Sequence, residues 1–292
     1  YFLLSGSVSS LSHCFSQTEF LSISRALFGI IKLDEVVHKD NFIHQGAYYK
    51  EYKWKYNHKT ITVRHVFLND KAKLAAVQND QKFLSMMKAT RMRDSVSNLL
   101  ACVIHGQHLL LFYDSYGPSL LTLWEREEDK SRQERYYLYR QLLNFSDDLD
   151  LSSIMYNNFN LENIRLVNGS VKKVLITDFS FSFAVQKTCG NNKHQIFPVL
   201  KFYKPDHRMV CSQMLQTLAL IGLYENRTNN PDYYQNHKED SIKELNYYCS
   251  RDNKAEDLRN FICHYLRKKN PQYNEIRKIR KEFERLVTSR RY

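Results

Sequence analysis

The sequence predicts an α+β fold in which a small antiparallel β-lobe with one main helix precedes a larger helical lobe. Three observations predict it. A strand-like pattern rich in Tyr, Val, Ile and Thr runs from Val36 to about Phe67, with turn signals at Gly46 and Asn57-His58. A helical period follows from Lys71 to Ala89. Beyond Gly117-Pro118, which breaks the sheet pattern, most apolar residues recur at helical spacing.

Changes in this period set the predicted boundaries. Residues 1–30 are Ser-rich and are expected to form a short helix and a connecting arm. The β-lobe is assigned to residues 31–116 and closes with two apolar strands, around VSNLLACVI and HLLLFY. The helical lobe is assigned to residues 117–292. With 292 residues, the chain is long enough for one large two-lobed core or two ordinary domains.

The helical lobe contains one predicted hairpin among its helices. A long helix is expected from Tyr136 to Asp148. Two short apolar runs, IRLV and VLITDF, then flank Asn168-Gly169, a dipeptide that favours a tight turn between antiparallel strands. Further helices are predicted in MVCSQMLQTLALIGLY, in AEDLRNFICHYLRKKNP and in the basic stretch RKIRKEFERLVTSRRY, where Phe283 and Leu286 mark an apolar face.

Composition argues against several protein classes. Apolar residues make up 43% and charged residues 25% of the chain, with only 8 Gly and 5 Pro, which is unlike disordered, collagen-like or solenoid proteins. No run of 18 or more apolar residues indicates a membrane span, and the opening segment lacks the basic region of a secretory signal. The six Cys show no metal-ligand spacing, which argues against zinc and a disulfide framework and predicts reduced, cytosolic thiols.

Two motifs in the helical lobe carry the chemical interpretation. Residues 156–163 read YNNFNLEN, and fifteen residues further on an apolar strand ends in Asp178-Phe179-Ser180. This is the spacing of a kinase catalytic loop, H-R-D-x-x-x-x-N, and of the D-F-G metal loop. Asn158 stands at the position of the catalytic Asp, and its carboxamide cannot take the proton of a substrate hydroxyl. No metal is predicted, although Asn163 and Asp178 keep oxygen atoms that could hold one.

The expected glycine-rich loop is degraded as well. A phosphate-binding loop needs glycines so that backbone N–H groups can approach the phosphates. In FIHQGAYYKEY only Gly46 remains, while His44 and Tyr49 occupy the positions of the first and third glycines. Both side chains are expected to add bulk over the phosphate site.

The remaining positions of the nucleotide pocket also depart from the kinase pattern. Arg64 replaces the lysine of the third strand, and its planar head is not equivalent to an ammonium. Aligning the helix through SMMK places Phe83 at the position of the partner glutamate, so Arg64 is expected to have no preset ion pair. Phe112 is the expected gatekeeper and Tyr113 the next residue of the pocket.

In these motifs the chain resembles the pseudokinase domain of Janus kinases, of an invertebrate, insect-like type. The likeness lies in SMMKATRMRDSVSNLLACVIHGQHLLLFY and continues through RQLLNFSDDLDLSSIMYNN. It covers roughly residues 32–287, and the opening YFLLSGSVSSLSHCF resembles the end of a preceding SH2-like domain. The resemblance implies a bilobal kinase fold without catalysis, because that family also has Asn in place of the catalytic Asp. Tyr156 and Asn157 depart from the family's loop His and Gly.

The resemblance implies a catalytically silent module that regulates an adjacent tyrosine kinase domain in cytokine-receptor signalling of the JAK–STAT type. The expected partners are that kinase domain, other domains of the parent protein and, indirectly, a cytokine receptor. Neither nucleic acid nor membrane insertion is expected, and the location is cytoplasmic, peripheral at the receptor. The expected contact surfaces are the helix around Lys71–Lys88 and the opening arm.

No cofactor is predicted, and two further functions stay open. Pseudokinase domains of that family commonly bind ATP without turning it over. Binding of ATP with Mg²⁺ is therefore the alternative to a pocket that binds no cofactor. The changes at residues 44, 49 and 64 argue against ATP binding. An atypical kinase is the first alternative function, because phosphoryl transfer depends largely on positioning and electrostatics. A nucleic-acid-binding protein is the second, favoured only by the net charge of +12 and the basic C-terminal stretch.

Overall fold

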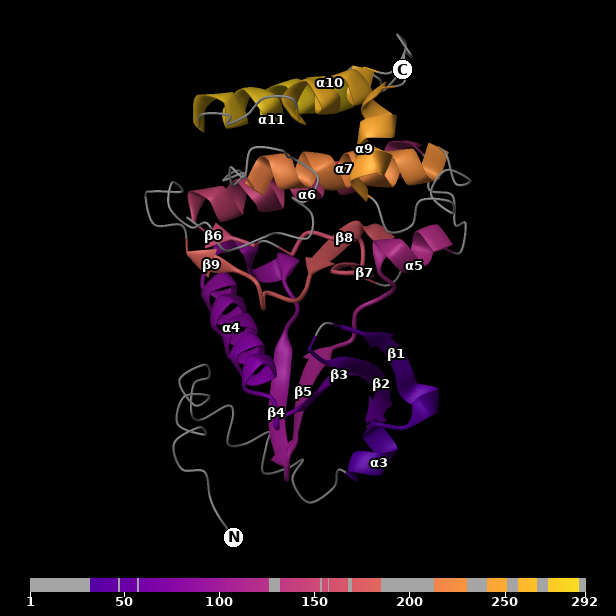
Figure 1. Cartoon of the computed structure of the whole chain (residues 1–292), viewed down its shortest axis with the longest axis vertical. Helices are drawn as coiled ribbons and strands as arrows, with labels where there is room; N and C mark the ends of the chain where they lie inside the picture. The colour runs from indigo at the N-terminus through magenta and orange to yellow at the C-terminus, as the bar shows by residue number, and fades with distance from the viewer. Residues whose placement is uncertain are drawn as a thin grey trace. The chain divides into compact units, whose positions relative to one another are not determined.

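The computed structural model divides the chain into two compact units, which are described separately (Figure 1). The first comprises Tyr1–Gly117 and Leu175–Phe181, and the second comprises Pro118–Val174 and Ser182–Tyr292. The structure describes residues 32–46, 48–56, 58–125, 132–152, 154–156, 158–167, 170–184, 213–229, 241–250, 257–266 and 273–288. The predicted arm of residues 1–30 lies outside these ranges.

An antiparallel sheet of five strands forms the base of the first unit, in the order β1-β2-β3-β5-β4. The strands are β1 (Phe42–Gln45), β2 (Lys50–Tyr56), β3 (Lys59–Phe67), β4 (Leu99–His105) and β5 (His108–Asp114). They confirm the predicted antiparallel β-lobe. The expected start of the strand pattern at Val36 is wrong, because Val36 ends the short helix α3 (Leu33–Val36) and a 3-10 turn (Lys39–Asn41) precedes β1.

The main helix of the first unit, α4 (Lys71–Lys88), confirms the prediction from residue 71. Asp70 caps it, because its Oδ1 accepts hydrogen bonds from the backbone N–H groups of Ala72 at 2.8 Å and Lys73 at 3.3 Å. Three- and four-residue spacing places the large apolar side chains on one buried face: Val77, Phe83, Leu84 and Met87. This face anchors the helix in the core of the unit.

Alternation along the strands divides the sheet into two faces with different chemistry. Val63 pairs across the strands with Phe112, and both belong to an apolar core that also contains Val36 of α3. Arg64, the next residue, points to the other face and pairs with Leu111. The sheet therefore carries an apolar core on one side and a buried cation on the other.

Helices dominate the second unit (Figure 1). The helices in its described ranges are α5 (Leu120–Glu125), α6 (Arg132–Leu151), α7 (Gln213–Asn229), α9 (Ser241–Ser250), α10 (Asp257–Leu266) and α11 (Tyr273–Thr288). Helix α6 confirms the prediction at Tyr136–Asp148 and is longer at both ends. From Gln213 to Arg227 every described side chain of α7 is buried, as its all-round apolar pattern predicts. No described helix is long and apolar enough to cross a membrane.

Two small sheets belong to the second unit, except for the last two residues of β8, which are part of the first. Strands β7 (Ile164–Val167) and β8 (Ser170–Ile176) pair with each other and confirm the predicted hairpin, although the Asn168-Gly169 turn lies outside the described residues. Strands β6 (Ile154–Met155) and β9 (Phe183–Ala184) form the other sheet. The chain segment from Tyr156 to Asn163 therefore leaves one short strand and enters another.

A disulfide between Cys249 of α9 and Cys263 of α10 corrects the expectation that all cysteines are reduced. The two Cα atoms are 5.5 Å apart, and the residues are separated by 14 positions. No sequence motif signals this bond, because it depends on the way two helices pack against each other. Cys102 in β4 is buried.

The basic C-terminal helix α11 is amphipathic. Phe283 is buried against Phe261 of α10, with ring centroids 6.1 Å apart, and Leu286 is half-buried. Arg280 pairs with Glu284 along the helix and with Asp147 of α6. The apolar face predicted from Phe283 and Leu286 is confirmed.

Candidate functional site

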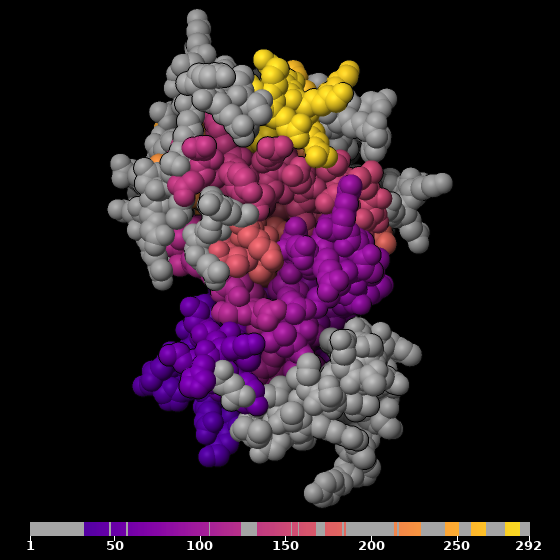
Figure 2. Space-filling view, turned by 180° about the vertical axis from the view of Figure 1, so that it is seen from behind, coloured from indigo at the N-terminus to yellow at the C-terminus, as the bar shows by residue number. Residues whose placement is uncertain are grey.

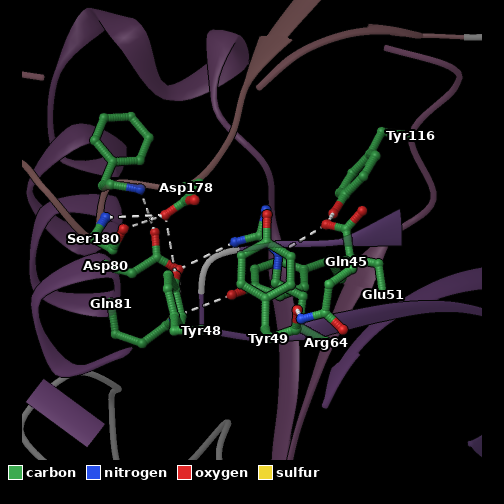
Figure 3. Close-up of polar contacts among 12 residues, drawn as sticks. Gln45, Tyr48, Tyr49, Glu51, Arg64, Asp80, Gln81, Tyr116, Asp178 and Ser180 are labelled. Atoms are coloured by element: carbon green, nitrogen blue, oxygen red, sulfur yellow. Dashed lines mark hydrogen bonds and ion pairs between the residues drawn. The ribbon is translucent and has the colours of Figure 1, made fainter. Parts of the chain in front are cut away.

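Arg64 forms two ion pairs in the interior of the first unit (Figure 3). Its Nε donates to Glu51 Oε1 at 3.0 Å, and its Nη1 donates to Asp80 Oδ2 at 3.3 Å. All three side chains are 0% exposed. The expectation that Arg64 has no ion pair is therefore wrong.

The partners of Arg64 come from positions that the kinase alignment did not consider. Glu51 lies directly opposite Arg64 in the antiparallel β2–β3 register. Asp80 lies on α4, about one helical turn before Phe83, and both side chains are buried on the inner side of the helix. The Asn57-His58 dipeptide, a turn signal in the sequence, could have placed Glu51 opposite Arg64.

Further polar groups surround the two carboxylates. The hydroxyl of Tyr116 donates to Glu51 Oε1 at 2.5 Å. The backbone N–H of Phe179 donates to Asp80 Oδ1 at 2.6 Å. Burial and the neighbouring Asp178 raise the pKa of Asp80 to about 6, although Arg64 and the Phe179 N–H oppose the shift. Asp80 is thus mainly ionised at neutral pH, and its charge is compensated by Arg64.

Two tyrosine rings lie close to the guanidinium of Arg64. Its Cζ lies 4.4 Å from the ring centroid of Tyr49 and 5.0 Å from that of Tyr113. Burial lowers the pKa of Arg64, but Tyr116, Tyr49 and Glu51 more than offset this, so the pKa is raised. Arg64 therefore stays charged although its side chain has no contact with solvent.

Gly46 gives Tyr49 the space to lie over Arg64. A Cβ atom on residue 46 would lie 2.5 Å from the Tyr49 ring, so no larger residue fits without displacing the ring. The Gly46 N–H donates to the Tyr49 carbonyl at 2.9 Å and is used within the turn. The His44 ring lies at the edge of Tyr49, with centroids 6.4 Å apart. The Tyr49 ring, which was predicted to add bulk over a phosphate site, is therefore buried beside Arg64.

Asp178 is bound by its own neighbours. Its Oδ1 accepts hydrogen bonds from Ser180 Oγ at 2.6 Å, from the Ser180 N–H at 3.2 Å and from the Tyr48 hydroxyl at 3.2 Å. Its φ of 64° lies in the left-handed region, which Asp tolerates better than most residues. Asn79 of α4 also donates to the Ser180 carbonyl at 2.8 Å. The Asp-Phe-Ser segment is thereby attached to α4.

We call Gly46, Tyr48, Tyr49, Glu51, Arg64, Asp80, Tyr113, Tyr116, Asp178 and Ser180 the Arg64 cluster. Six of the residues singled out from sequence meet there: Gly46, Tyr49, Arg64, Tyr113, Asp178 and Ser180. Sequence reasoning missed Tyr48, Glu51, Asp80 and Tyr116. Their roles depend on contacts between segments that are distant in the chain.

Phe112 does not line this cluster, and its assignment as gatekeeper of a nucleotide pocket stays a prediction. It lies on the opposite face of the sheet, in the apolar core, with its ring 5.8 Å from that of Trp54. Tyr113 is the residue of β5 that faces Arg64. Successive residues of a strand face opposite sides of the sheet, so Phe112 and Tyr113 have different surroundings.

Asn158 and Asn163 belong to the second unit and bond locally. Both side chains are buried. Asn163 Nδ2 donates to the Asn158 carbonyl at 3.0 Å, and Asn160 Nδ2 donates to Asn158 Oδ1 at 3.3 Å. Asn157 lies outside the described residues. The amide of Asn158 acts here as a partner in a local hydrogen-bond network.

Tyr156 and Gln213 fix the start of this loop. The Tyr156 side chain is fully buried, and its ring lies 5.0 Å from that of Phe159. The Tyr156 N–H donates to Gln213 Oε1 of α7 at 2.8 Å. Gln213 gave no recognisable signal in the sequence, because its partner is 57 positions away.

Comparison with known proteins adds no family assignment to this geometry. No protein-family model matches the chain, and no curated protein shows significant similarity to it. Among the described side chains, no group of three or more His, Cys, Asp and Glu is arranged to hold a metal ion. The chemistry of the Arg64 cluster therefore has to be inferred from its own contacts.

Proposed function

We propose that this chain is a catalytically silent, kinase-like regulatory module that acts through contact with an adjacent tyrosine kinase domain. In this proposal the first unit corresponds to a kinase small lobe and the second unit to a large lobe. The parent protein would belong to the Janus type, and the module would hold the kinase domain inactive. The commitment of Arg64 to internal partners is the observation that carries the proposal.

The contacts of Arg64 support a pocket without a free phosphate ligand. A cation that binds ATP must present N–H groups to phosphate oxygens. Here Nε and Nη1 donate to Glu51 and Asp80, and the ring centroids of Tyr49 and Tyr113 lie 4.4 Å and 5.0 Å from Cζ. Moving Arg64 towards a nucleotide would leave two carboxylates buried without their cation, which costs several kcal/mol, about 3–5 per broken pair.

The metal-loop residue supports the same conclusion. An Asp that binds Mg²⁺ must direct its oxygen atoms to the ion. Asp178 Oδ1 instead accepts three hydrogen bonds from Ser180 and Tyr48. Together with an amide at position 158, this arrangement provides neither a general base nor an open carboxylate oxygen at Oδ1.

Helix α4 is the surface that we assign to the partner kinase domain. Asp80 and Asn79 fasten its inner face to the Asp-Phe-Ser segment. Its outer face exposes Lys82, Ser85 and Met86, with Met86 40% exposed, and this helix is at the surface in Figure 2 (purple). A fixed helix with an exposed apolar side chain can transmit contact without changing shape.

Binding of Mg²⁺-ATP tests the silent pocket. The melting temperature of the chain should not change in millimolar Mg²⁺-ATP, because a ligand that does not bind cannot stabilise the fold. The variant Tyr49→Ala removes one cover of Arg64, and a rise in melting temperature in this variant alone would agree with occlusion by Tyr49. A clear rise in the unaltered chain, abolished by Asp178→Ala, would contradict the proposal.

Peptide phosphorylation tests the regulatory role. The purified chain, added to an active Janus-type tyrosine kinase domain, should lower the rate of peptide phosphorylation. Met86→Glu should weaken this inhibition, whereas Phe42→Glu, which changes a side chain of similar exposure (47%) on β1, should not. Equal inhibition by both variants would exclude α4 as the contact surface.

One observation favours an atypical kinase as a second candidate. Active kinases need an ion pair between a third-strand cation and a carboxylate of the following helix. Arg64 and Asp80 form such a pair. Restoring the base with Asn158→Asp and measuring transfer of labelled phosphate distinguishes the candidates: incorporation that requires Asp178 supports the kinase, and none supports the silent module.

A further inference from the structure

The sheet of the first unit carries a pair of histidines on the face opposite to Arg64. His65 lies in β3 next to Arg64, and His108 begins β5. The strand register places them diagonally, since His65 pairs with Leu110 and Phe67 pairs with His108. Their facing nitrogens, His65 Nε2 and His108 Nδ1, are 2.8 Å apart. Both side chains are half-buried.

The two rings meet edge to edge. Their planes differ by only 21°, and their centroids are 5.0 Å apart. This separation is close to the N–N distance plus the two ring radii, so the facing nitrogens lie near the line between the centroids. The in-plane directions of the two facing nitrogens therefore point at each other. One of these nitrogens must carry a hydrogen and donate it to the lone pair of the other.

We propose that His65 and His108 form a binding site for a divalent transition metal of the Cu²⁺, Ni²⁺ or Zn²⁺ type. Two imidazole nitrogens bind such an ion at about 2.0–2.1 Å each, which places neighbouring ligand nitrogens about 3 Å apart. The nitrogens already have nearly that spacing, and each ring must turn outward by about 40° so that both lone pairs point to one ion. Water fills the remaining coordination positions, because no group of three or more ligands is arranged for a metal among the residues that the structure describes. This proposal is independent of the regulatory function.

Binding replaces the bridging hydrogen by the metal. Each facing nitrogen then gives its lone pair to the ion, and the displaced proton moves through solvent to the outer nitrogen of the same ring. His65 becomes protonated at Nδ1 and His108 at Nε2, so both rings stay neutral and no net proton is released from a neutral pair. The same two-nitrogen chemistry selects borderline metals over Mg²⁺ or Ca²⁺.

The surroundings keep His65 available as a neutral ligand. Burial, His108 and Lys50 lower the pKa of His65 to about 4. Tyr52 lies 6.4 Å from the His65 ring, and Phe67 lies 5.1 Å from the His108 ring, measured between centroids. Lys50, which pairs with His65 across β2 and β3, is the charge that opposes a bound cation. Lys50→Met should therefore tighten metal binding.

Electron paramagnetic resonance with half an equivalent of Cu²⁺ tests the site. The unaltered chain should show hyperfine coupling to two imidazole nitrogens. His65→Phe keeps a ring between Tyr52 and the neighbouring strand but removes the ligand nitrogen, so the two-nitrogen signal should be lost. His38→Gln is the matched control, because His38 is exposed and bonds locally to Asp40, and it should leave the signal unchanged.

A second ligand variant and a thermal measurement complete the test. His108→Gln should also abolish the two-nitrogen signal, and Ni²⁺ or Zn²⁺ should raise the melting temperature only when both histidines are present. Circular dichroism in a chelator establishes that each variant is folded. The proposal is overturned if folded His65→Phe or His108→Gln keeps the signal of the unaltered chain, or if that chain binds no Cu²⁺ through two imidazoles.

Discussion

The Arg64 cluster and the loop from Tyr156 to Asn163 use buried polar groups in different ways. In the first unit, carboxylates on β2 and α4 converge on one cation of β3, and the Asp-Phe-Ser segment joins them from 99 positions away in sequence. In the second unit, Asn158, Asn160 and Asn163 bond to each other within five positions. One network is charged and long-range, and the other is neutral and local.

This difference determines how much each network contributes to its unit. Buried charges are costly to separate, so every member of the Arg64 cluster depends on the others. Neutral amide hydrogen bonds exchange with water at small net gain. We therefore expect the first network to determine the stability of its unit, and the second mainly to determine the shape of one loop.

Removing Asp80 is expected to have the largest effect. Asp80→Ala leaves the buried Arg64 with Glu51 alone and should lower the free energy of unfolding by about 3–5 kcal/mol. Urea denaturation measures it. The matched control Asp94→Ala changes an exposed carboxylate after α4 and should change stability by less than about 0.5 kcal/mol. Similar small losses in both variants would contradict the charged-network interpretation.

Reducing the disulfide of the second unit should have the next largest effect. Cys249 and Cys263 close a short loop, and a cross-link of this size contributes about 3 kcal/mol by restricting the unfolded chain. Thermal unfolding with and without a thiol reductant measures it. The double variant Cys249→Ser, Cys263→Ser should already show the lower melting temperature and should not respond to reductant.

Asp150 offers a buried carboxylate in the second unit to compare with Asp80. Burial raises its pKa to about 7, and the Gln213 backbone hydrogen bond only partly opposes this. Among the described residues, no group donates to its Oδ2. The pKa of Asp150 in the folded chain is above its unfolded value of 3.8. The contribution of Asp150 to the free energy of unfolding is therefore complete below pH 4 and is lost as the pH rises through 7.

Asp150→Asn should therefore stabilise the chain at pH 8 by about 2 kcal/mol, allowing for partial solvent screening, and should have little effect at pH 4. Melting temperatures between pH 4 and pH 8 measure the difference. The control Asp114→Asn changes an exposed carboxylate and should show no such pH dependence. A constant difference across this range for Asp150→Asn would contradict the assigned pKa.

The smallest effect is expected in the local amide network. Asn163→Ala removes the donor to the Asn158 carbonyl and should lower the free energy of unfolding by about 1 kcal/mol. Urea denaturation compares it directly with Asp80→Ala. A loss as large as that of Asp80→Ala would show that the two networks have similar importance.

Several local features of the structure could be predicted from sequence. The three- and four-residue spacing of Val77, Leu84 and Met87 predicts α4, and Asn168-Gly169 between two apolar runs predicts the β7–β8 hairpin. The apolar pattern on every side of α7 predicts its burial. These succeed because helix and strand periods are properties of short segments.

The candidate site could be predicted only in part. Arg64, Gly46 and Asp178 stand out from sequence because their residue types and spacing follow a known order. Tyr113 was singled out and faces Arg64, whereas Phe112, one residue before it, lies on the opposite face of the sheet. The partners of Arg64 were missed because an aligned glutamate position does not reveal a carboxylate one turn away on the same helix.

The sequence by itself determined the helices α4, α6 and α7, the antiparallel β-lobe, the β7–β8 hairpin and the amide at position 158. The tertiary structure decided that Arg64 is neutralised by Glu51 and Asp80, that Tyr49 covers it and that Cys249 reaches Cys263. The physical reason is range: hydrophobic period and turn preference act over a few residues, whereas the pairing of buried charges and thiols depends on which distant segments meet in the core.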